Sequence, residues 1–572
     1  MLRTSLVMFV ALLSLLASHA TGQPAKPSAA TTQFVPVPEP AEHKEPVPWN
    51  LATLLKHVPP LRHDASGRLA MISHLVFRMS EDDKSFEEGK PLSEEMIKEL
   101  VQRGLTQRIL PDVKYIPYAQ ALQKAGAQVI VFQGMAFNDP VRNTDENLHV
   151  LPKDFRRDPR QPAQQPRYPC PLVIGDWRKK ADELRKLFKA YKDAGIEIAA
   201  VWWDWEVEPY AGRSRFREAA ACARCRKQFP PGVLDDFARY RVFISNWRRM
   251  LFSTYMVAPV LEHYPKCSVT NWAVVISSLE RPTHGCWGLG RQRPRAFKDV
   301  LELARADYFY IPGDLGMFNT ANPVVYGNTL YYRKHWKKGW NWPLDAAHMD
   351  RVYTHVMLGQ ISAHADNAQR LAPDTLSVPW VDRYCPDDRD EKIPILSRPR
   401  YREILRHCWL RGADSMQIFN IDWSKDPRKI TIATEEIEDA VAVYDEMLAY
   451  RPFLEGGSIL NTHVPDVRDD GPVWSGLRLG DRAVVRTFTM GAKTVPANVR
   501  PFDHASTVTL DCPSRGATYL LRLRGGKVKV EALFLVGEQY VVVRSPRVAG
   551  PVLRNSVWQL DTPSEPTLES VP

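Results

Sequence analysis

The sequence predicts an α/β fold, a (β/α)8 TIM barrel followed by a C-terminal antiparallel β-sandwich. Between residues 49 and 455, short apolar runs alternate with amphipathic stretches, which is typical of a parallel sheet covered by helices. Beyond residue 456 the helical spacing stops, and short β-branched segments are separated by turn residues. The 572 residues are 44% hydrophobic and 25% charged, which excludes bulk disorder and a multi-span membrane protein. A doubly wound open sheet is the alternative to the barrel.

Residues 1–20 match a secretory signal peptide. They contain one early basic residue, Arg3, an apolar run Leu6–Leu16, and the small residues Ser18 and Ala20 spaced as a cleavage site. The run is shorter than the roughly 20 residues that span a bilayer. We therefore expect a secreted or periplasmic protein without a membrane span after signal removal, and a retained N-terminal anchor is the alternative. Residues 21–48 are rich in Pro and Ala, so we expect a flexible linker there.

Eight apolar runs in residues 49–455 are predicted to be the strands of the barrel. They are Leu69–Phe77, Leu105–Leu110, Gln128–Gln133, Ile196–Trp203, Ser268–Val274, Tyr308–Ile311, Thr375–Val381 and Ser415–Asn420. Helices are expected between them, and the clearest begins after the capping residue Asp176 and ends at Gly195. Its apolar stripe consists of Trp177, Ala181, Leu184, Phe188 and Tyr191.

The predicted sandwich covers residues 456–572 and is expected to pack as a layered unit of its own. Its expected strands are Leu477–Leu479, Ala483–Thr489, Ser506–Leu510, Tyr519–Leu523, Lys527–Val530 and Gln539–Val543. Before it, the connections Met135–Gly175 and Gly212–Lys266 exceed ordinary loops. Long insertions of this kind on a barrel usually build the walls of a cleft.

The charge pattern argues against a nucleic-acid partner. Lys and Arg number 76 against 66 Asp and Glu, which leaves a net charge of +10. This excess would favour acidic partners if it were clustered, but the sequence has no basic run interleaved with aromatic residues. We therefore expect no nucleic acid among the partners, and the sequence indicates no oligomeric state.

The fourth apolar run ends in the densest group of polar and aromatic residues. In a strand, alternate side chains share a face, so Trp202, Asp204, Glu206 and Glu208 are expected to lie on one side. Carboxylates packed beside indole rings at a strand end lower the stability of the fold unless they are paired or have a role in catalysis or binding. One protonated and one ionised carboxyl beside aromatic faces suit the cleavage of a glycosidic bond. A hydrogen-bonded structural strand end is the alternative interpretation.

Other predicted strand ends supply partners for this chemistry. Asp314 and Asp382 are candidates for the opposing catalytic carboxylate. The candidates for contacts with sugar hydroxyls and ring faces are Trp202, Glu208, Asn271, Trp272, Trp380, Arg383 and Trp423. Taken singly, each of these residues is equally typical of a loop cap or a salt bridge.

We expect no cofactor and no metal in the reaction. The sequence contains no Gly-x-Ser-x-Gly, no His-Glu-x-x-His and no Gly-rich phosphate loop. Eight cysteines are present, and Cys222 and Cys225 are spaced as a Cys-x-x-Cys pair. They could form a disulfide, remain free thiols, or hold a structural metal with ligands from Cys170, Cys267 or Cys286.

Four short stretches resemble the family 42 β-galactosidases and related barrels of the same clan. They are Glu206 at the fourth strand end, Cys222–Phe229, Val269–Trp272 and Gly412–Phe419. In that family the carboxylate after strand four is the acid/base, so the resemblance implies this role for Glu206. The chain has Trp205 where the family has Asn, and Asp382 where the clan uses Glu.

The same fourth strand resembles two other groups of glycosidases. Asp204-Trp205-Glu206 is similar to the end of the family 18 chitinase motif, and Trp202-Trp203-Asp204 is similar to the nucleophile strand of α-fucosidases and α-galactosidases. The second resemblance implies a partner acid from strand six, here Asp314. We therefore predict a secreted glycoside hydrolase with a carbohydrate substrate. The alternative is a non-catalytic carbohydrate-binding or cell-surface protein on the same scaffold.

Overall fold

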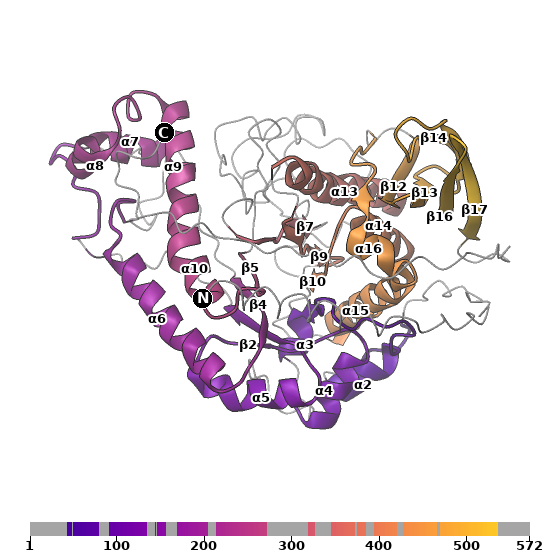
Figure 1. The fold of residues 1–572 in the computed structure, drawn as a ribbon, viewed down its shortest axis with the longest axis horizontal. Coiled ribbons are helices and arrows are strands. Elements are labelled where there is room, and N and C mark those ends of the chain that lie inside the picture. Colours follow the sequence, from indigo (N-terminus) through magenta and orange to yellow (C-terminus); the bar gives the residue numbers. More distant parts are fainter. Residues whose placement is uncertain are drawn as a thin grey trace, which may run out of the picture. The chain divides into compact units, whose positions relative to one another are not determined.

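The computed structural model describes residues 43–47, 50–78, 91–133, 144, 146–155, 169–203, 213–271, 318–326, 345–371, 374–384, 394–419, 427–465 and 470–535 (Figure 1). The predicted signal peptide and most of the predicted linker lie outside these residues. The end of that linker is packed rather than free. Val47 is buried, and its backbone N–H donates to Thr431 Oγ1 at 2.9 Å.

Parallel strands form two four-stranded sheets. One has the order β2 (Arg108–Ile109), β3 (Val129–Gln133), β4 (Ile198–Trp203) and β5 (Ser268–Asn271). The other has the order β1 (Ile72–Ser73), β10 (Gln417–Ile418), β9 (Trp380–Asp382) and β7 (Val324–Tyr326). A parallel pair, β6 (Thr320–Ala321) and β8 (Leu376–Ser377), precedes β7 and β9 in the chain. The predicted parallel α/β architecture is confirmed at this level.

Both parallel sheets contribute to one buried cluster. Its members are Ile72, Ile130, Phe132, Ala200, Trp202, Val324, Tyr326, Val378 and Trp380. These are alternate residues of their strands, and the residues between them pack into a second, larger cluster beneath the helices. We call the first group the interior cluster. The chain therefore has an inner and an outer apolar layer on its parallel strands.

Two joints connect strands of different sheets. Met71, just before β1, forms a parallel bridge with Leu105, just before β2. On the other side, Ser268 Oγ of β5 donates to Thr320 Oγ1 of β6 at 2.8 Å. The first contact connects the two four-stranded sheets, and the second connects β5 to the β6–β8 pair.

One predicted strand differs from the structure, and another is not tested by it. The first run is a strand only at Ile72–Ser73 and continues as helix α3 (His74–Arg78). The expected strand Tyr308–Ile311 lies outside the described residues, and the strand between β5 and β9 is formed by residues 320–326. Proline interrupts it between β6 and β7, as Pro379 interrupts β8 and β9, because proline has no N–H for the ladder.

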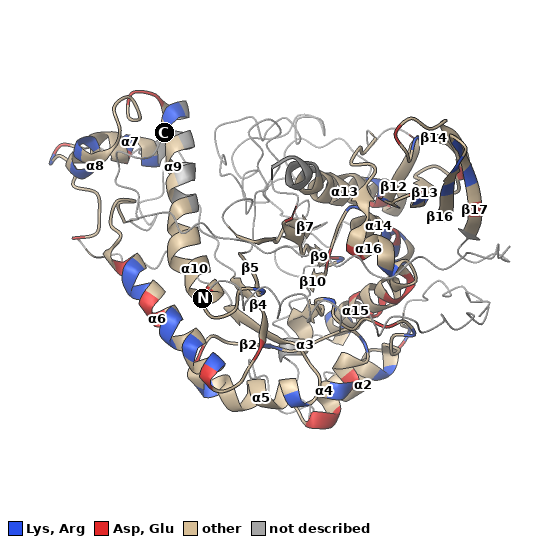
Figure 2. Cartoon of the chain, in the orientation of Figure 1, with Lys and Arg blue, Asp and Glu red and all other residues tan. Residues whose placement is uncertain are grey.

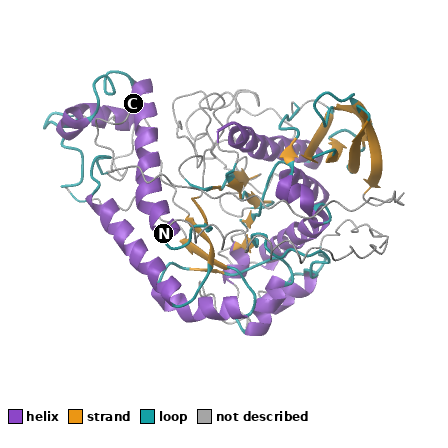
Figure 3. Cartoon of the chain, viewed as in Figure 1, coloured by secondary structure: helices purple, strands orange, loops and turns teal. Residues whose placement is uncertain are grey.

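Helices cover the parallel strands between residues 51 and 456 (Figure 3). They are α2 (Leu51–His57), α3, α4 (Glu94–Val101), α5 (Ile116–Lys124), α6 (Gly175–Asp193), α7 (Arg213–Ala221), α8 (Ala223–Gln228), α9 (Phe237–Phe252), α10 (Ala258–Leu261), α13 (Ala346–Leu371), α14 (Arg398–Leu410), α15 (Pro427–Leu448) and α16 (Arg451–Gly456). The predicted apolar stripe of α6 is confirmed, since all five of its residues are buried. Its exposed side carries both signs of charge in Figure 2. Among the described helices, none has the length and apolar character needed to cross a membrane.

The C-terminal region is an antiparallel sheet with a second, two-stranded layer. The sheet has the order β11 (Ser458–Ile459), β12 (Pro472–Leu479), β13 (Arg482–Thr489), β16 (Ala517–Arg524) and β17 (Lys527–Leu535). The second layer pairs β14 (Val495–Val499) with β15 (Val508–Cys512). One buried cluster contains residues of both layers, among them Val485, Ala497 and Leu510. The sequence missed β14 because Pro496 and Asn498 interrupt its apolar pattern, and Gln539–Val543 lies outside the described residues.

A buried ladder of ion pairs joins α14 to α15. Arg398, Arg402 and Arg406 lie four residues apart on α14 and therefore share one face. Asp439 of α15 accepts from Arg398 Nη2 at 2.8 Å and from Arg402 Nε at 2.6 Å. Glu446 accepts from Arg406 Nε at 2.9 Å. The three guanidinium groups and Asp439 are buried, so these charges are stable only as a paired set.

The same helix α14 also contacts the C-terminal sheet through buried polar groups. Glu403 accepts from Arg486 Nη2 of β13 at 2.7 Å. His407 contacts Ser475 Oγ of β12 at 2.7 Å and Glu403 Oε1 at 3.2 Å. Burial lowers the pKa of His407 to about 4, so the ring is neutral at neutral pH.

We expect Asp439→Ala to destabilise the protein by about 3–5 kcal/mol, because Arg398 and Arg402 would remain buried without their shared partner. Chemical denaturation measures the change. The control is Asp193→Ala, which removes an exposed pair with Lys189 and should leave the unfolding midpoint unchanged. Equal midpoints for wild type and Asp439→Ala would contradict the role of the ladder.

The folded protein should lose stability as the pH falls from about 6.5 to about 4, in part through His407. The pKa of His407 is about 4 in the folded chain against 6.5 for an unperturbed histidine, so the unfolded chain binds the proton first. This difference in pKa corresponds to a loss of roughly 3 kcal/mol in the free energy of unfolding. Thermal unfolding of wild type and His407→Gln across this range checks it, and the variant should show the shallower pH dependence. If the unfolding temperatures of the two proteins changed with pH in the same way, His407 would have no part in the loss of stability at low pH.

Candidate active site and candidate metal centre

The carboxyl ends of the parallel strands surround an aromatic group in the interior cluster. His74 follows β1, and its ring centroid lies 4.8 Å from Trp380, 5.5 Å from Phe132 and 5.4 Å from Phe419. Tyr326 of β7 stacks on Phe419 at 4.9 Å. Asp382 is the last residue of β9, two positions after Trp380, and it is fully buried. This end of the strands therefore combines aromatic rings with a carboxyl group.

Most of the predicted site residues lie outside the described residues. They are Asp204, Glu206, Glu208, Trp272, Asp314 and Trp423. The element that precedes the first three is described, because β4 ends at Trp203. Asn271 is the last residue of β5 and is half-buried. The catalytic and substrate-binding roles assigned to these residues stay predictions.

Trp202 and Trp380 belong to the core in this structure. Both rings are fully enclosed, and their indole N–H groups donate to Ser268 Oγ at 3.1 Å and to Asn322 Oδ1, respectively. They pack the interior rather than present a face to a sugar. Arg383 is likewise used internally, because its guanidinium binds Glu435 at 2.5 Å.

Three polar residues of the interior were missed by the sequence analysis, and His74 is one of them. Arg108 of β2 is buried, lies 4.0 Å from the centroid of the Phe132 ring and contacts His74 Nε2 at 3.2 Å. Gln417 of β10 is fully buried beside Trp380, and neither of its amide atoms has a hydrogen-bond partner among the described residues. The signal that could have found them is a long polar residue inside an otherwise apolar run.

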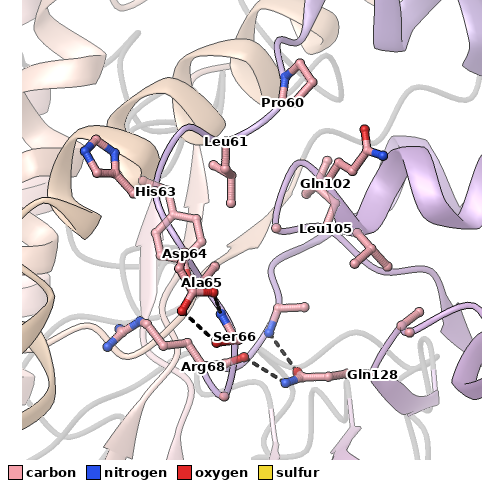
Figure 4. Close-up of a pocket in the computed structure, with 17 residues that line it drawn as sticks. Pro60, Leu61, His63, Asp64, Ala65, Ser66, Arg68, Gln102, Leu105 and Gln128 are labelled. Carbon is pink, nitrogen blue, oxygen red and sulfur yellow. Dashed lines mark hydrogen bonds between the residues drawn. The ribbon is translucent and has the colours of Figure 1, made fainter. Parts of the chain in front are cut away.

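A cavity of about 630 Å³ lies at the opposite, amino end of β1, β2 and β3 (Figure 4). Ala70, Leu105 and Gln128, which precede these strands, are among its lining residues. The side-chain amide of Gln128 forms structural hydrogen bonds, since it accepts from Ala70 N at 2.9 Å and donates to Arg68 O at 2.7 Å. This cavity is therefore separate from Asp382 and from the strand ends that precede Asp204.

Four potential metal ligands meet between the connections that follow β3 and β4. The ligand atoms of His149, Cys170, Cys222 and Cys225 all lie within 4.8 Å of one another. The Sγ atoms of Cys170 and Cys225 are 3.5 Å apart. That separation is far from the about 2.05 Å of a disulfide and close to the about 3.8 Å between thiolates around a tetrahedral zinc ion. The donor set fits a structural Cys₃His zinc site.

The surrounding backbone holds these ligands in place. Val150 N–H donates to Cys222 Sγ at 3.3 Å, and Ala223 N–H donates to Val150 O at 2.9 Å. Cys170 N–H donates to Asn147 O at 2.7 Å. Hydrogen bonds from Cys170 and then Cys225 lower the pKa of Cys222 well below its usual range, which favours a thiolate there. Hydrogen bonds of this kind orient the side chains that bind a metal.

This cluster provides ligands for the structural metal that the sequence left open as an alternative to a disulfide or free thiols. Of the three further cysteines considered, Cys170 joins the Cys-x-x-Cys pair, Cys267 lies outside the cluster, and Cys286 is outside the described residues. None of the six described cysteines forms a disulfide. His149 was missed because a single histidine in a long connection has no motif around it, and only the fold brings it to the thiols.

No family model matches the chain, and no curated protein matches its sequence. Similar solved structures include a debranching enzyme from Nostoc punctiforme, with 10% identity, a TM-score of 0.35, and coverage of 80% of this chain and 96% of that one. A β-galactosidase from the Antarctic haloarchaeon Halorubrum lacusprofundi has 13% identity, a TM-score of 0.35, and coverage of 64% and 56%. An α-L-fucosidase isoenzyme from Paenibacillus thiaminolyticus has 12% identity, a TM-score of 0.37, and coverage of 67% and 50%.

The three solved structures named above are glycoside hydrolases. The chain spans about half the length of the β-galactosidase and of the fucosidase. TM-scores this low carry no weight for the activity, so the function proposed below rests on the residues of this chain.

We expect the purified protein to contain one zinc ion per chain, measured by plasma mass spectrometry. Cys225→Ser should lose the zinc and lower the unfolding temperature, because metal binding stabilises only the folded state. A strong chelator should lower the unfolding temperature of wild type but not of this variant. Cys267→Ala is the matched control, since its thiol is equally buried but lies outside the cluster. Zinc retained in Cys225→Ser would contradict the assignment.

Proposed function

We propose that this protein is a secreted glycoside hydrolase with a two-carboxylate mechanism, built on a closed (β/α)8 barrel. Closure is supported by the pairing order. The chain of contacts runs from β1 through β2, β3, β4 and β5 to β6, and then through β8 and β9 to β10 and back to β1. The interior cluster, with residues from both sheets, is what fills such a barrel.

One observation carries the proposal: β4 and β9 end on the same side of the interior cluster. Trp202 of β4 and Trp380 of β9 are both members of that cluster. Asp204 follows Trp202 by two positions, and Asp382 follows Trp380 by two positions. All pairings of these strands are parallel, so both strands run in the same direction and present carboxylates at their carboxyl ends.

Each carboxylate has a separate role in this mechanism. Glu206, protonated, donates its proton to the glycosidic oxygen while ionised Asp382 attacks the anomeric carbon, and the bond to the leaving group breaks. Water then attacks the same carbon, Glu206 takes the proton from water, and the ester to Asp382 breaks. Asp204 orients the sugar beside Glu206. Asp314 is the alternative opposing carboxylate.

Sugar contacts are assigned to polar and aromatic residues beyond the strand ends. Asn271 at the end of β5 is half-buried and can bind a hydroxyl group. Trp272, Trp423 and Glu208 complete the proposed contacts with ring faces and hydroxyls. Trp202 and Trp380 have no sugar contact in this proposal, because both belong to the buried interior cluster.

The metal centre has a structural role in this proposal. When bound, zinc holds four ligands in a fixed geometry and takes no part in bond cleavage. The residues that bear those ligands connect the segment after β3 with the segment after β4, which also contains Glu206. Metal ligation would also protect close thiols from oxidation outside the cytoplasm.

The activity is tested on a panel of aryl glycosides and plant and marine polysaccharides. Wild type should cleave at least one of them. Glu206→Gln and Asp382→Asn should each lower kcat by roughly 10²–10⁴-fold while the fold is retained, because positioned proton transfer and nucleophilic attack both require the carboxyl group. The control is Asp193→Asn, on the exposed side of α6.

The anomer of the first product, observed by nuclear magnetic resonance, distinguishes retention from inversion. Retention agrees with attack by Asp382, and inversion agrees with a water between the carboxylates. Binding of a polysaccharide without cleavage by wild type would instead support the carbohydrate-binding alternative. Near-wild-type turnover in Glu206→Gln would remove this residue from the mechanism.

A further inference from the structure

Helix α15 directs two consecutive carboxyl groups at the end of β9. Glu436 Oε1 accepts hydrogen bonds from the backbone N–H groups of Arg383 and of Tyr384, the latter at 2.7 Å. Glu435 binds the Arg383 guanidinium at 2.5 Å. These acceptors contact the two residues that directly follow Asp382. The end of this strand is therefore fixed by a helix far along the chain.

Glu436 is an unusual choice for a purely structural acceptor. It is fully buried, and its second oxygen, Oε2, has no hydrogen-bond partner among the described residues. A buried carboxyl group without full pairing costs stability.

The groups that face Glu436 come from three elements. Asp382 and Arg383 lie at the end of β9, Tyr401 comes from α14, and Glu435 is its neighbour on α15. Burial, and next the negative charge of Asp382, raise the pKa of Glu436 well above its usual range. This direction favours the neutral form of Glu436 beside Asp382.

We propose that Glu436 is a positioning residue for Asp382, which it serves by holding the backbone of residues 383 and 384 through Oε1. This inference rests on the proposed function, in which Asp382 is a catalytic carboxylate. A neutral acceptor next to Asp382 fixes the strand end without adding a second negative charge. Small displacements of a reacting group can cost about 10²-fold in rate, so the hydrogen bonds of Glu436 control the rate of the chemical step rather than substrate binding.

Two variants test whether position 436 needs a hydrogen-bond acceptor or specifically a carboxyl group. Glu436→Gln keeps an oxygen acceptor for both N–H groups, whereas Glu436→Ala removes it. The control is Asp193→Ala on α6, where an exposed carboxylate pairs with Lys189 away from this contact. Should the alanine variant fail to fold, Glu436→Asp replaces it, because this change retracts the acceptor by one methylene group.

Kinetics on an aryl glycoside cleaved by wild type provides the first measurement. Glu436→Ala should lower kcat by about 10²-fold with KM within about threefold of wild type, and Glu436→Gln should restore kcat to within about threefold. Asp193→Ala should keep the wild-type kcat. A general loss of stability would not be rescued by the amide in this way.

Hydrogen exchange measured by mass spectrometry provides a second readout that needs no substrate. The peptide containing residues 380–384 should exchange faster in Glu436→Ala than in wild type and remain protected in Glu436→Gln. Unchanged exchange or unchanged kcat in Glu436→Ala overturns the proposal, as does a Gln variant as slow as the Ala variant. A wild type that cleaves no glycoside overturns the proposed function itself, and with it any catalytic role for this contact.

Discussion

The buried ion-pair ladder between α14 and α15 is the constraint on which much of this structure depends. Three arginines of α14 face acidic residues of α15, and the three guanidinium groups and Asp439 are buried. Desolvation of each charge is expensive and is offset only when every partner is in place. The ladder therefore fixes how α14 and α15 pack against each other. The contacts that these helices make with β9 and with the C-terminal sheet depend on that packing.

On one side, the ladder determines the end of β9. Glu435 and Glu436 extend the acidic face of α15 to Arg383 and Tyr384, directly after Asp382. On the other side, Glu403 and His407 of α14 contact Arg486 and Ser475 of the C-terminal sheet. The antiparallel sheet thus contributes to the rigidity of the helices that position a candidate catalytic carboxylate.

The parallel strands give the chain two distinct ends. At the carboxyl ends, aromatic side chains, His74 and Asp382 lie together, and Asp204 follows β4 directly. At the amino ends lies the cavity beside Gln128, whose amide group is bonded to the backbone of Ala70 and Arg68. The cluster of His149, Cys170, Cys222 and Cys225 adds a third constraint, since it brings the connection after β3 to the segment of α7 and α8 after β4.

The sequence by itself determined the class of the fold, the apolar stripe of α6, most of the parallel strands and the antiparallel C-terminal sheet. These follow from local periodicity, because alternate or helically spaced apolar residues must share one buried face. It also determined that carboxylates follow the fourth strand. It could not place the strand at residues 320–326, where Pro323 interrupts the apolar run.

Only the tertiary structure decided which distant groups meet. His149 reaches three cysteines from a connection without a motif, Arg108 lies over Phe132 inside the sheets, and Glu436 reaches the backbone after Asp382. It also decided that Trp202 and Trp380 pack the core, although they look like sugar-binding rings in the sequence. Such contacts depend on how whole elements pack against one another, and the local spacing of residues carries no information about the side chain that arrives from another part of the chain.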